Sequence, residues 1–265
     1  MTTGTMEAPI TPAEAAPEVY PLDAETTEVE IRIGKVRLYH RLTRPTYEQL
    51  RRRERKQMIW QQDVGGGETE TTIETAEANR SLWNEIAAAV RNYNGPDWLP
   101  LDDALKSKIP EAHKERAIEA LYTVETEFIA ASYIDEDAGI YRLEGPAELH
   151  CRQTIHGRFH VEHFLRQPTQ KELDRYQGHA FKLREERRAG QKTRARAQTD
   201  MSAGVQFYDA LLLRMEGASW EGMTWGESAE RDPALRARFI AAYDPLLKAN
   251  IASAVGNYLT PHLSD

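Results

Sequence analysis

The sequence repeats itself, and this repeat constrains the fold more than any other feature of the chain. Residues from about Ile33 to Ile129 recur between about Ile155 and Val255, at a spacing of 122 to 123 positions. Self-similarity at a fixed period predicts repeated structural units. We therefore expect two tandem units, residues 27–133 and 134–265, related by a pseudo-twofold axis. The clearest match sets residues 36–50 against 159–173, with these pairs aligned: His40 and His163, Leu42 and Leu165, Pro45 and Pro168, Thr46 and Thr169, Leu50 and Leu173.

The first residues of the chain differ in composition from the rest. Residues 1–30 contain seven of the 42 acidic side chains and none of the 34 Lys and Arg, so most of the formal charge of −8 belongs to this end. The same stretch contains four prolines and is rich in Ala, Thr and Glu. Such a composition buries too little apolar surface to offset the entropy lost on ordering. We expect residues 1–26 to form a disordered acidic tail.

Several protein classes are disfavoured by what the chain lacks. No stretch approaches 18 consecutive apolar residues, and the first thirty residues lack the charged start and apolar run of a secretory signal. The single cysteine, Cys151, cannot form an internal disulfide. These features predict a soluble, cytoplasmic protein without a membrane partner.

Each unit begins with the pattern of a β-hairpin. Val29, Ile31 and Ile33 alternate with charged residues, which is typical of a half-buried strand. Gly34-Lys35 follows, and glycine in the first position of a two-residue connection suits a type II′ turn. In the second unit, alternating residues 149–155 and 159–165 flank His156-Gly157. An additional short strand is expected at residues 140–143.

A helix-start signal follows each hairpin. The hydroxyl of Thr46 or Thr169 can accept from an amide of the first helical turn, while Gln49 or Glu172 accepts from the threonine's own amide. These capping boxes predict helices over residues 47–61 and 170–189. The polar stretches 63–72 and 190–199 are expected to be irregular connections.

Two more helices are expected in each unit. Apolar residues at helical spacing predict second helices that stop at Asn94-Gly95 and at Gly217, and third helices that start at Pro110 and Pro233. Pro245 should kink or split the last helix. The predicted fold class is α+β, with a hairpin followed by three helices, β-β-α-α-α, occurring twice.

The densest group of histidines lies in the second hairpin. The group comprises residue types that bind zinc when they converge on one point: His150, His156, His160 and His163, with Cys151 and Glu162 among them. On an extended strand, however, His156 and His160 lie about 13 Å apart, too far to share an ion. We favour a structural role for His163, as for His40, and expect no cofactor. A metal protein or an enzyme that uses these residues remains an alternative hypothesis.

Basic residues gather between positions 182 and 196. Clustered Lys and Arg are the electrostatic signature of nucleic-acid binding. Glu185 and Glu186 interrupt this cluster and no aromatic residue is interleaved with it, so we favour a solvated helix face, with nucleic-acid binding as the alternative. The candidate residues are Arg184, Arg187, Arg188, Lys192, Arg194 and Arg196.

Catalytic motifs are mostly absent from the sequence. The glycine run 65–67 is followed by Glu68 and not by the Lys of a phosphate-binding loop, and no Gly-x-Ser-x-Gly elbow occurs. A duplicated unit with strand edges able to pair with another chain favours a non-enzymatic structural or protein-interaction component of a larger assembly. Self-association or a protein partner is expected. Phage or prophage assembly proteins are one class of this kind, although no motif assigns the chain to them.

Overall fold

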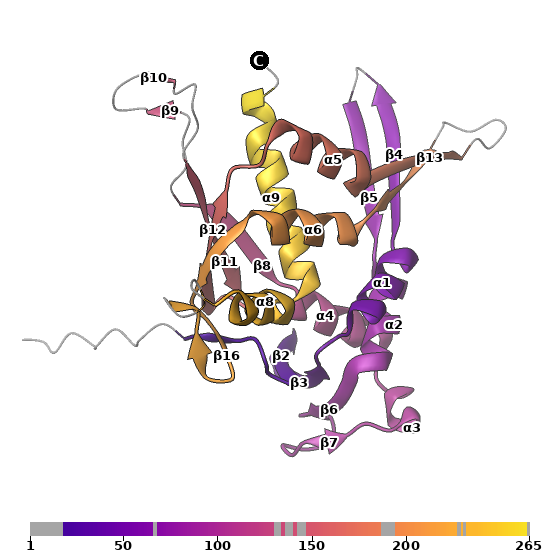
Figure 1. The fold of residues 1–265 in the computed structure, drawn as a ribbon. Helices are drawn as coiled ribbons and strands as arrows, with labels where there is room; N and C mark the ends of the chain where they lie inside the picture. The colour runs from indigo at the N-terminus through magenta and orange to yellow at the C-terminus, as the bar shows by residue number, and fades with distance from the viewer. Residues whose placement is uncertain are drawn as a thin grey trace, which may run out of the picture.

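The protein has a mixed α+β fold in which helices and strands are interspersed along the whole chain (Figure 1). The computed structural model describes residues 18–65, 68–129, 134–135, 140–141, 147–186, 194–226, 229 and 232–263. Among the helices of these ranges, none has the length and apolar character that a membrane-spanning segment requires.

The elements up to residue 128 begin with a short strand and a hairpin. In order they are β1 (Tyr20–Pro21), β2 (Thr26–Ile33), β3 (Val36–Thr43), α1 (Tyr47–Lys56), β4 (Met58–Gly65), β5 (Glu68–Glu74), α2 (Ala76–Ile86), β6 (Ala87–Arg91), β7 (Leu99–Pro100), α3 (Asp103–Lys106), α4 (Glu111–Leu121) and β8 (Val124–Phe128).

The later elements include a second hairpin and end in the longest described helix. They are β9 (Ile134–Asp135), β10 (Ile140–Tyr141), β11 (Glu148–Ile155), β12 (Phe159–Arg166), α5 (Gln170–Ala180), β13 (Phe181–Glu186), β14 (Arg194–Thr199), α6 (Met201–Leu211), β15 (Leu212–Glu216), β16 (Ala218–Trp220), β17 (Met223–Thr224), α8 (Pro233–Ala242) and α9 (Pro245–Leu263).

Three four-stranded sheets organise the described chain. Their strand orders are β2-β3-β6-β7, β15-β12-β11-β8 and β13-β14-β4-β5. Both hairpins predicted from the sequence are present, as β2–β3 and β11–β12. Gly34 has a φ of 59°, a left-handed conformation that glycine adopts readily in a hairpin turn. The strand β8, which lies before residue 134, pairs with β11 and so joins the sheet of the second half.

The helices after the hairpins begin with capping boxes. Thr46 and Gln49 exchange side-chain and backbone hydrogen bonds at the start of α1. At the start of α5, the Thr169 amide donates to Glu172 Oε2 at 2.9 Å, and the Glu172 amide donates to Thr169 Oγ1 at 3.3 Å. Arg166 also binds this carboxylate and holds the pKa of Glu172 at about 2.

The structure corrects the predicted lengths of these helices. The helix α1 ends at Lys56 and α5 at Ala180, and the chain continues as strands β4 and β13. The strands β5 and β14 occupy much of the predicted irregular connections at 63–72 and 190–199. The alternating, threonine-rich sequence of residues 68–74 is typical of a strand, and the glycine run before it is a turn signal. The interpretation of residues 63–72 as an irregular connection overlooked both signals.

The second and third helices also stop early. The helices α2 and α6 give way to β6 and β15 at Ala87 and Leu212. Alanine-rich residues 87–89 favour a helix by propensity, but β6 pairs with β3 and this tertiary contact decides the conformation. Residues 124–128, expected to end the third helix, alternate between apolar and polar residues and form β8. The break expected at Pro245 is present, between α8 and α9.

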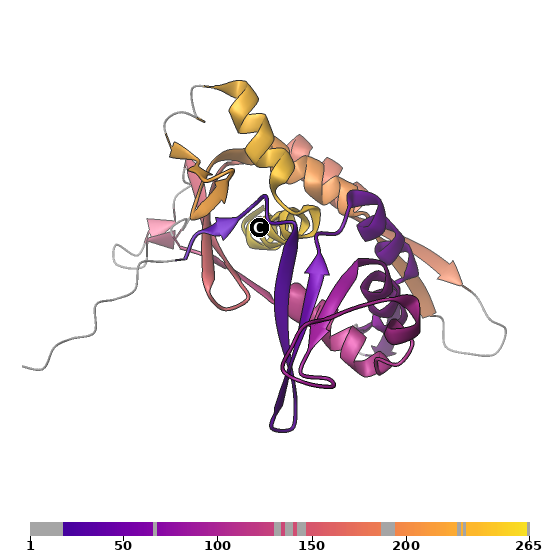
Figure 2. The same ribbon diagram turned by 90° about the horizontal axis from the view of Figure 1, so that it is seen from below.

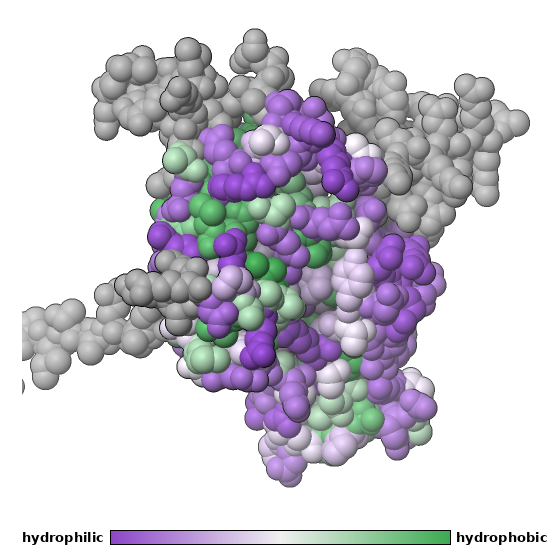
Figure 3. Space-filling view, in the orientation of Figure 1, coloured by the Kyte–Doolittle hydropathy of each residue, from purple (hydrophilic) through white to green (hydrophobic). Residues whose placement is uncertain are grey.

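Two apolar cores share the helices α6 and α9. Most buried residues of the first half form one core and most of the second half form the other, but Met201 of α6 belongs to the first core and Leu22 to the second. Residues of α9 such as Ile251 and Val255 belong to the second core, whereas Leu246 and Ala249 pack against the first. Figure 2 shows α9 end-on near the middle of the molecule. Figure 3 shows mostly hydrophilic side chains on the face of Figure 1, with apolar ones gathered around α6 and α8.

Part of the predicted disordered tail is ordered. Residues 1–17 lie outside the described residues. Tyr20–Pro21 pairs in parallel with β16, and Leu22 is 1% exposed in the second core. Arg44 donates to the carbonyl oxygens of Leu22 and Ala242. The acidic composition concealed this short apolar stretch, which is anchored by strand pairing and burial.

Two left-handed glycines provide a matched test of local packing. A Cβ at Gly217, where φ is 75°, would collide with the carbonyl oxygen of His160, whereas Gly157 has a φ of 65° and open space around it. We expect Gly157→Ala to lower the free energy of unfolding by about 1–2 kcal/mol, because a left-handed residue with a Cβ is strained. Gly217→Ala should lower it clearly further. Urea denaturation of both variants measures the difference, and equal losses would contradict the role of the His160 contact.

Candidate interaction surface

A buried hydrogen-bond chain surrounds His40 in the first half. Trp83 Nε1 donates to His40 Nδ1 at 3.1 Å, and His40 Nε2 lies 3.0 Å from the Tyr93 hydroxyl. That hydroxyl lies 3.1 Å from Nδ1 of His113. Because the Trp indole can only donate, Nδ1 of His40 accepts and its Nε2 carries the proton. Tyr93 therefore accepts from His40 and donates to His113.

A comparable network surrounds His163 in the second half. Gln153 Nε2 donates to the Leu247 carbonyl at 3.1 Å, so Gln153 Oε1 is the acceptor for the Tyr243 hydroxyl. Tyr243 has one proton to donate, and it therefore accepts from His163 Nε2 at 3.3 Å. His163 Nδ1 then accepts from the Tyr208 hydroxyl at 3.0 Å. His163 carries its proton on Nε2, as His40 does.

Both histidines are held in the neutral form. Each is fully buried, and burial lowers the pKa of His40 to about 4 and that of His163 to about 3. A proton on Nδ1 of His40 would also place two donors, the imidazolium and the Trp83 indole, against each other. The geometry agrees with the structural role favoured from the sequence: these histidines join a strand to the helix that covers it.

The remaining predicted metal ligands have separate partners. His156 Nε2 bonds the Leu121 carbonyl at 2.9 Å, and His160 Nδ1 lies 3.1 Å from the Thr154 hydroxyl. The imidazole rings of His156 and His160 therefore bond to different residues.

Glu162 is occupied by two basic groups on the adjacent strand. Arg152 Nε donates to it at 2.6 Å, and His150 Nε2 lies 2.8 Å from its other oxygen. In the part of the chain that the structure describes, no group of three His, Cys, Asp or Glu side chains is placed to hold a metal ion. The structure thus brings none of the proposed metal ligands together around a common point.

The Arg-rich segment lies in a strand pair and not along a helix. Arg184 belongs to β13, and Arg194 and Arg196 belong to β14. The register sets Arg184 opposite Arg196, and Arg196 opposite Trp60 of β4. The register thus places an aromatic position directly across from Arg196. The sequence concealed this neighbour, since Trp60 is more than a hundred positions away. Arg187, Arg188 and Lys192 lie outside the described residues.

The sheet β13-β14-β4-β5 is built from both halves of the chain. Each half supplies one antiparallel hairpin, and an antiparallel pairing of β14 with β4 joins them. Figure 1 shows β4, β5 and β13 together on one side of the molecule, away from β8, β11 and β12. Within the described ranges, the outer edges of β13 and β5 have no strand partner. We call this sheet the shared sheet and these two edges its free edges.

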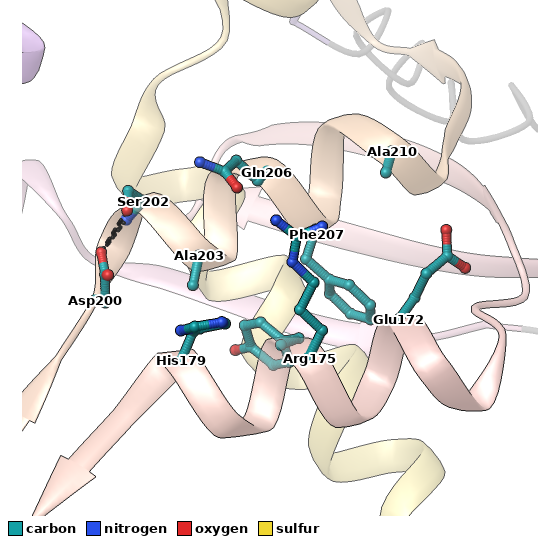
Figure 4. A pocket seen from close by; sticks show the side chains of 10 residues that line it. Glu172, Arg175, His179, Asp200, Ser202, Ala203, Gln206, Phe207 and Ala210 are labelled. Carbon is teal, nitrogen blue, oxygen red and sulfur yellow. Dashed lines mark hydrogen bonds between the residues drawn. The ribbon is translucent and has the colours of Figure 1, made fainter.

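A groove of about 320 Å³ lies between α5 and α6. Arg175 reaches from α5 toward α6 beside the ring of Phe207, as Figure 4 shows. The Tyr176 and Phe207 rings stack with their centroids 4.5 Å apart. The other polar lining residues are Glu172, His179, Asp200, Ser202 and Gln206.

The corresponding helix pair of the first half is bridged by side chains. Arg52 of α1 pairs with Glu85 of α2 at 2.6 Å, and Lys56 donates to Ser81 at 2.6 Å. The helices α2 and α6 have the same length and can be aligned from their first to their last residues. In this alignment Ala210 stands at the position of Glu85.

Comparison with known proteins adds no further guide to this site. No family model, curated protein or solved structure matches the chain.

The two neutral histidines predict a specific dependence of stability on pH. In the unfolded chain each titrates near the ordinary value of 6.5, but in the folded protein only near 4 and 3. The unfolded state therefore binds more protons below pH 6.5. The free energy of unfolding should fall as the pH drops from 6.5 to 4.5, by up to about 1.4 kcal/mol per pH unit for each histidine.

Denaturant unfolding at several pH values tests this dependence. The variant His163→Gln should flatten the slope by about one proton, because it removes one buried group that must stay neutral. His160→Gln, at an exposed position, is the matched control and should keep the parent slope. Glu172 loses its contribution only between its ordinary pKa of 4.5 and its folded value of about 2, below the window that is measured. An unchanged slope in His163→Gln would contradict the assignment.

Proposed function

We propose that the chain is a non-enzymatic structural protein of two tandem, related units, and that it acts in a larger assembly by pairing strand edges with another chain. The observation that carries this proposal is the shared sheet with its two free edges. An unpaired strand edge presents a row of backbone donors and acceptors that another chain can complete.

The registers of the two hairpins support the relation between the units. The strands β4 and β13 lie 123 positions apart in the sequence, and β5 and β14 lie 125 apart. With these offsets the Cα pairs of the two hairpins coincide. The pair Met58–Glu74 corresponds to Phe181–Thr199, and Asp63–Thr69 corresponds to Glu186–Arg194.

The other sheets support the same relation. The β3–β6 pairing shifts register between Arg41 and Leu42, and the β12–β15 pairing shifts between Phe164 and Leu165, 123 positions later. Each shift lies beside a buried histidine that accepts from the covering helix. The helix α4 packs on α2, and α9 packs on the corresponding helix α6. The halves differ in the strand beside these helices, because α4 also packs on β2 whereas α9 packs on β8.

Sedimentation velocity of the purified chain over a wide concentration range tests the proposed function. We expect species heavier than the 30.2 kDa chain, or a defined complex with a protein cross-linked to the shared sheet. A protein that stays at 30.2 kDa at every concentration, and that yields no cross-link through the shared sheet in its native cell, would contradict the proposal.

Nucleic-acid binding is the second candidate function, and the placement of Trp60 opposite Arg196 favours it. Arginines next to an aromatic residue suit a phosphate backbone with stacked bases. We expect mobility shifts that weaken with salt. Arg194→Ala and Arg196→Ala should each reduce the slope of this salt dependence by about one, because each removes a guanidinium that binds a phosphate. Arg37→Ala, in the β2–β3 hairpin, is the control, and binding that is equally strong in all variants would contradict a role for this sheet.

A further inference from the structure

We infer that the partner at the free edges is a second copy of this chain, joined head to tail by antiparallel pairing of β5 with β13. This inference rests on the proposed function, and it names the occupant and the register. Its basis is the contact that already joins the two halves within one chain.

The contact within the chain joins strands that are not equivalent. The strand β14 corresponds to β5, yet it pairs with β4 and leaves β13, the counterpart of β4, at the outer edge. A twofold axis through this sheet would instead pair equivalent strands, β4 with β13 or β5 with β14. A contact between unlike edges leaves one edge of each kind free, and such a contact can be repeated. The free edges of the shared sheet are this unlike pair.

The register of the inner contact predicts that of the outer one. Within the chain, Arg196 lies opposite Trp60 and Ala195 lies opposite Gln61. Subtracting 125 from a β14 position gives its counterpart in β5, and adding 123 to a β4 position gives its counterpart in β13. The first pair then becomes Thr71 opposite Leu183, and the second becomes Glu70 opposite Arg184.

This register places one pair of opposite charges directly across the two free edges. The strand β5 contains Glu68, Glu70 and Glu74 and no basic residue, while β13 contains Lys182 and Arg184 followed by Glu185 and Glu186. The register that sets Glu70 opposite Arg184 also sets Glu68 opposite Glu186. Opposite charges placed directly across a strand pair stabilise it. The equivalent positions of the inner contact are Ala195 and Gln61, which are uncharged. The outer contact would therefore gain the Glu70–Arg184 ion pair, which the inner contact lacks, and would set Glu68 and Glu186 opposite each other at its end.

Repetition of this contact generates a ring or a filament. Each chain offers one β5 edge and one β13 edge, so a second chain satisfies one edge and leaves the other free. The assembly is a closed ring if successive rotations between neighbouring copies return to the first copy, and a filament otherwise.

Cysteine cross-linking tests the register directly. The only natural cysteine, Cys151, is buried, and burial raises the pKa of its thiol to about 12, so it should not compete. Opposite residues of an antiparallel pair have Cα atoms about 4.5–5.5 Å apart, within reach of a disulfide. Within one chain, β5 and β13 are separated by three strand spacings, about 14 Å. A disulfide between positions 71 and 183 must therefore join two chains.

Three samples distinguish the arrangements under mild oxidation. The double variant Thr71→Cys with Leu183→Cys should form a ladder of covalent multimers. Each single variant alone should remain uncross-linked, and an equal mixture of the two should form covalent dimers only. A single variant that cross-links as efficiently as the mixture would overturn the head-to-tail arrangement, as would a double variant that stays monomeric after oxidation.

Charge reversal provides a second readout that does not depend on disulfide chemistry. Glu70→Arg and Arg184→Glu should each weaken self-association by roughly threefold to tenfold, and the two together should restore it. Lys171→Glu, at an exposed position of α5, is the matched control and should leave self-association unchanged. Circular dichroism verifies that each variant is folded. A double reversal that is as weak as the single ones would contradict the predicted pairing.

The outcomes separate this inference from the proposed function. If the chain assembles in sedimentation but the position 71 and 183 variants neither cross-link nor respond to charge reversal, the head-to-tail inference is wrong and the proposed function stands. If the chain neither assembles nor binds a partner, the proposed function is wrong as well.

Discussion

The helix α9 is the element on which both halves of the molecule depend. A helix that is apolar on more than one side must be buried by more than one neighbour. Ile251 and Val255 lie in the second core, while Leu246 and Ala249 contact the first. Gly204 of α6 permits close approach, since a Cβ there would lie 3.1 Å from the Cα of Ala249. Removal of α9 would therefore expose two cores, and the halves cannot be regarded as independent folding units.

The sequence predicted those elements whose signals are local. Alternating residues around Gly34 indicated a hairpin, and the threonine and the glutamine or glutamate three positions later indicated the starts of α1 and α5. It failed where a distant strand decides the conformation. Ala87 and Ala89 have no strand signal of their own, and they are extended because β3 lies beside them. The strand pairs of the shared sheet had partial signals, in the glycine run and in the threonines of β5, which the interpretation of residues 63–72 as an irregular connection overlooked.

The histidine networks show a similar division between what composition reveals and what contacts reveal. The alignment of His40 with His163 was visible in the sequence, but their roles depend on Trp83 and Tyr208, which are different residue types. Both donate to Nδ1 of the histidine. The two histidines therefore have the same tautomer, although an indole N–H is the donor in one half and a phenol O–H in the other. A search for identical residues would not have detected this correspondence. Conversely, the metal hypothesis grouped residues by proximity in sequence, although the strand geometry gives His156 and His160 different neighbours.

The pairing of β14 with β4 can form only after most of the chain has been synthesised. Arg194 lies opposite Gln62 but follows it by more than a hundred residues. At a translation rate of about 5–20 residues per second, β14 is synthesised roughly ten seconds after β4. During that time β4 can pair with β5 on one side only, and its other edge is unpaired, like the outer edge of β5. The order of the elements along the chain therefore leaves one side of β4 without its strand partner until most of the second half has been synthesised.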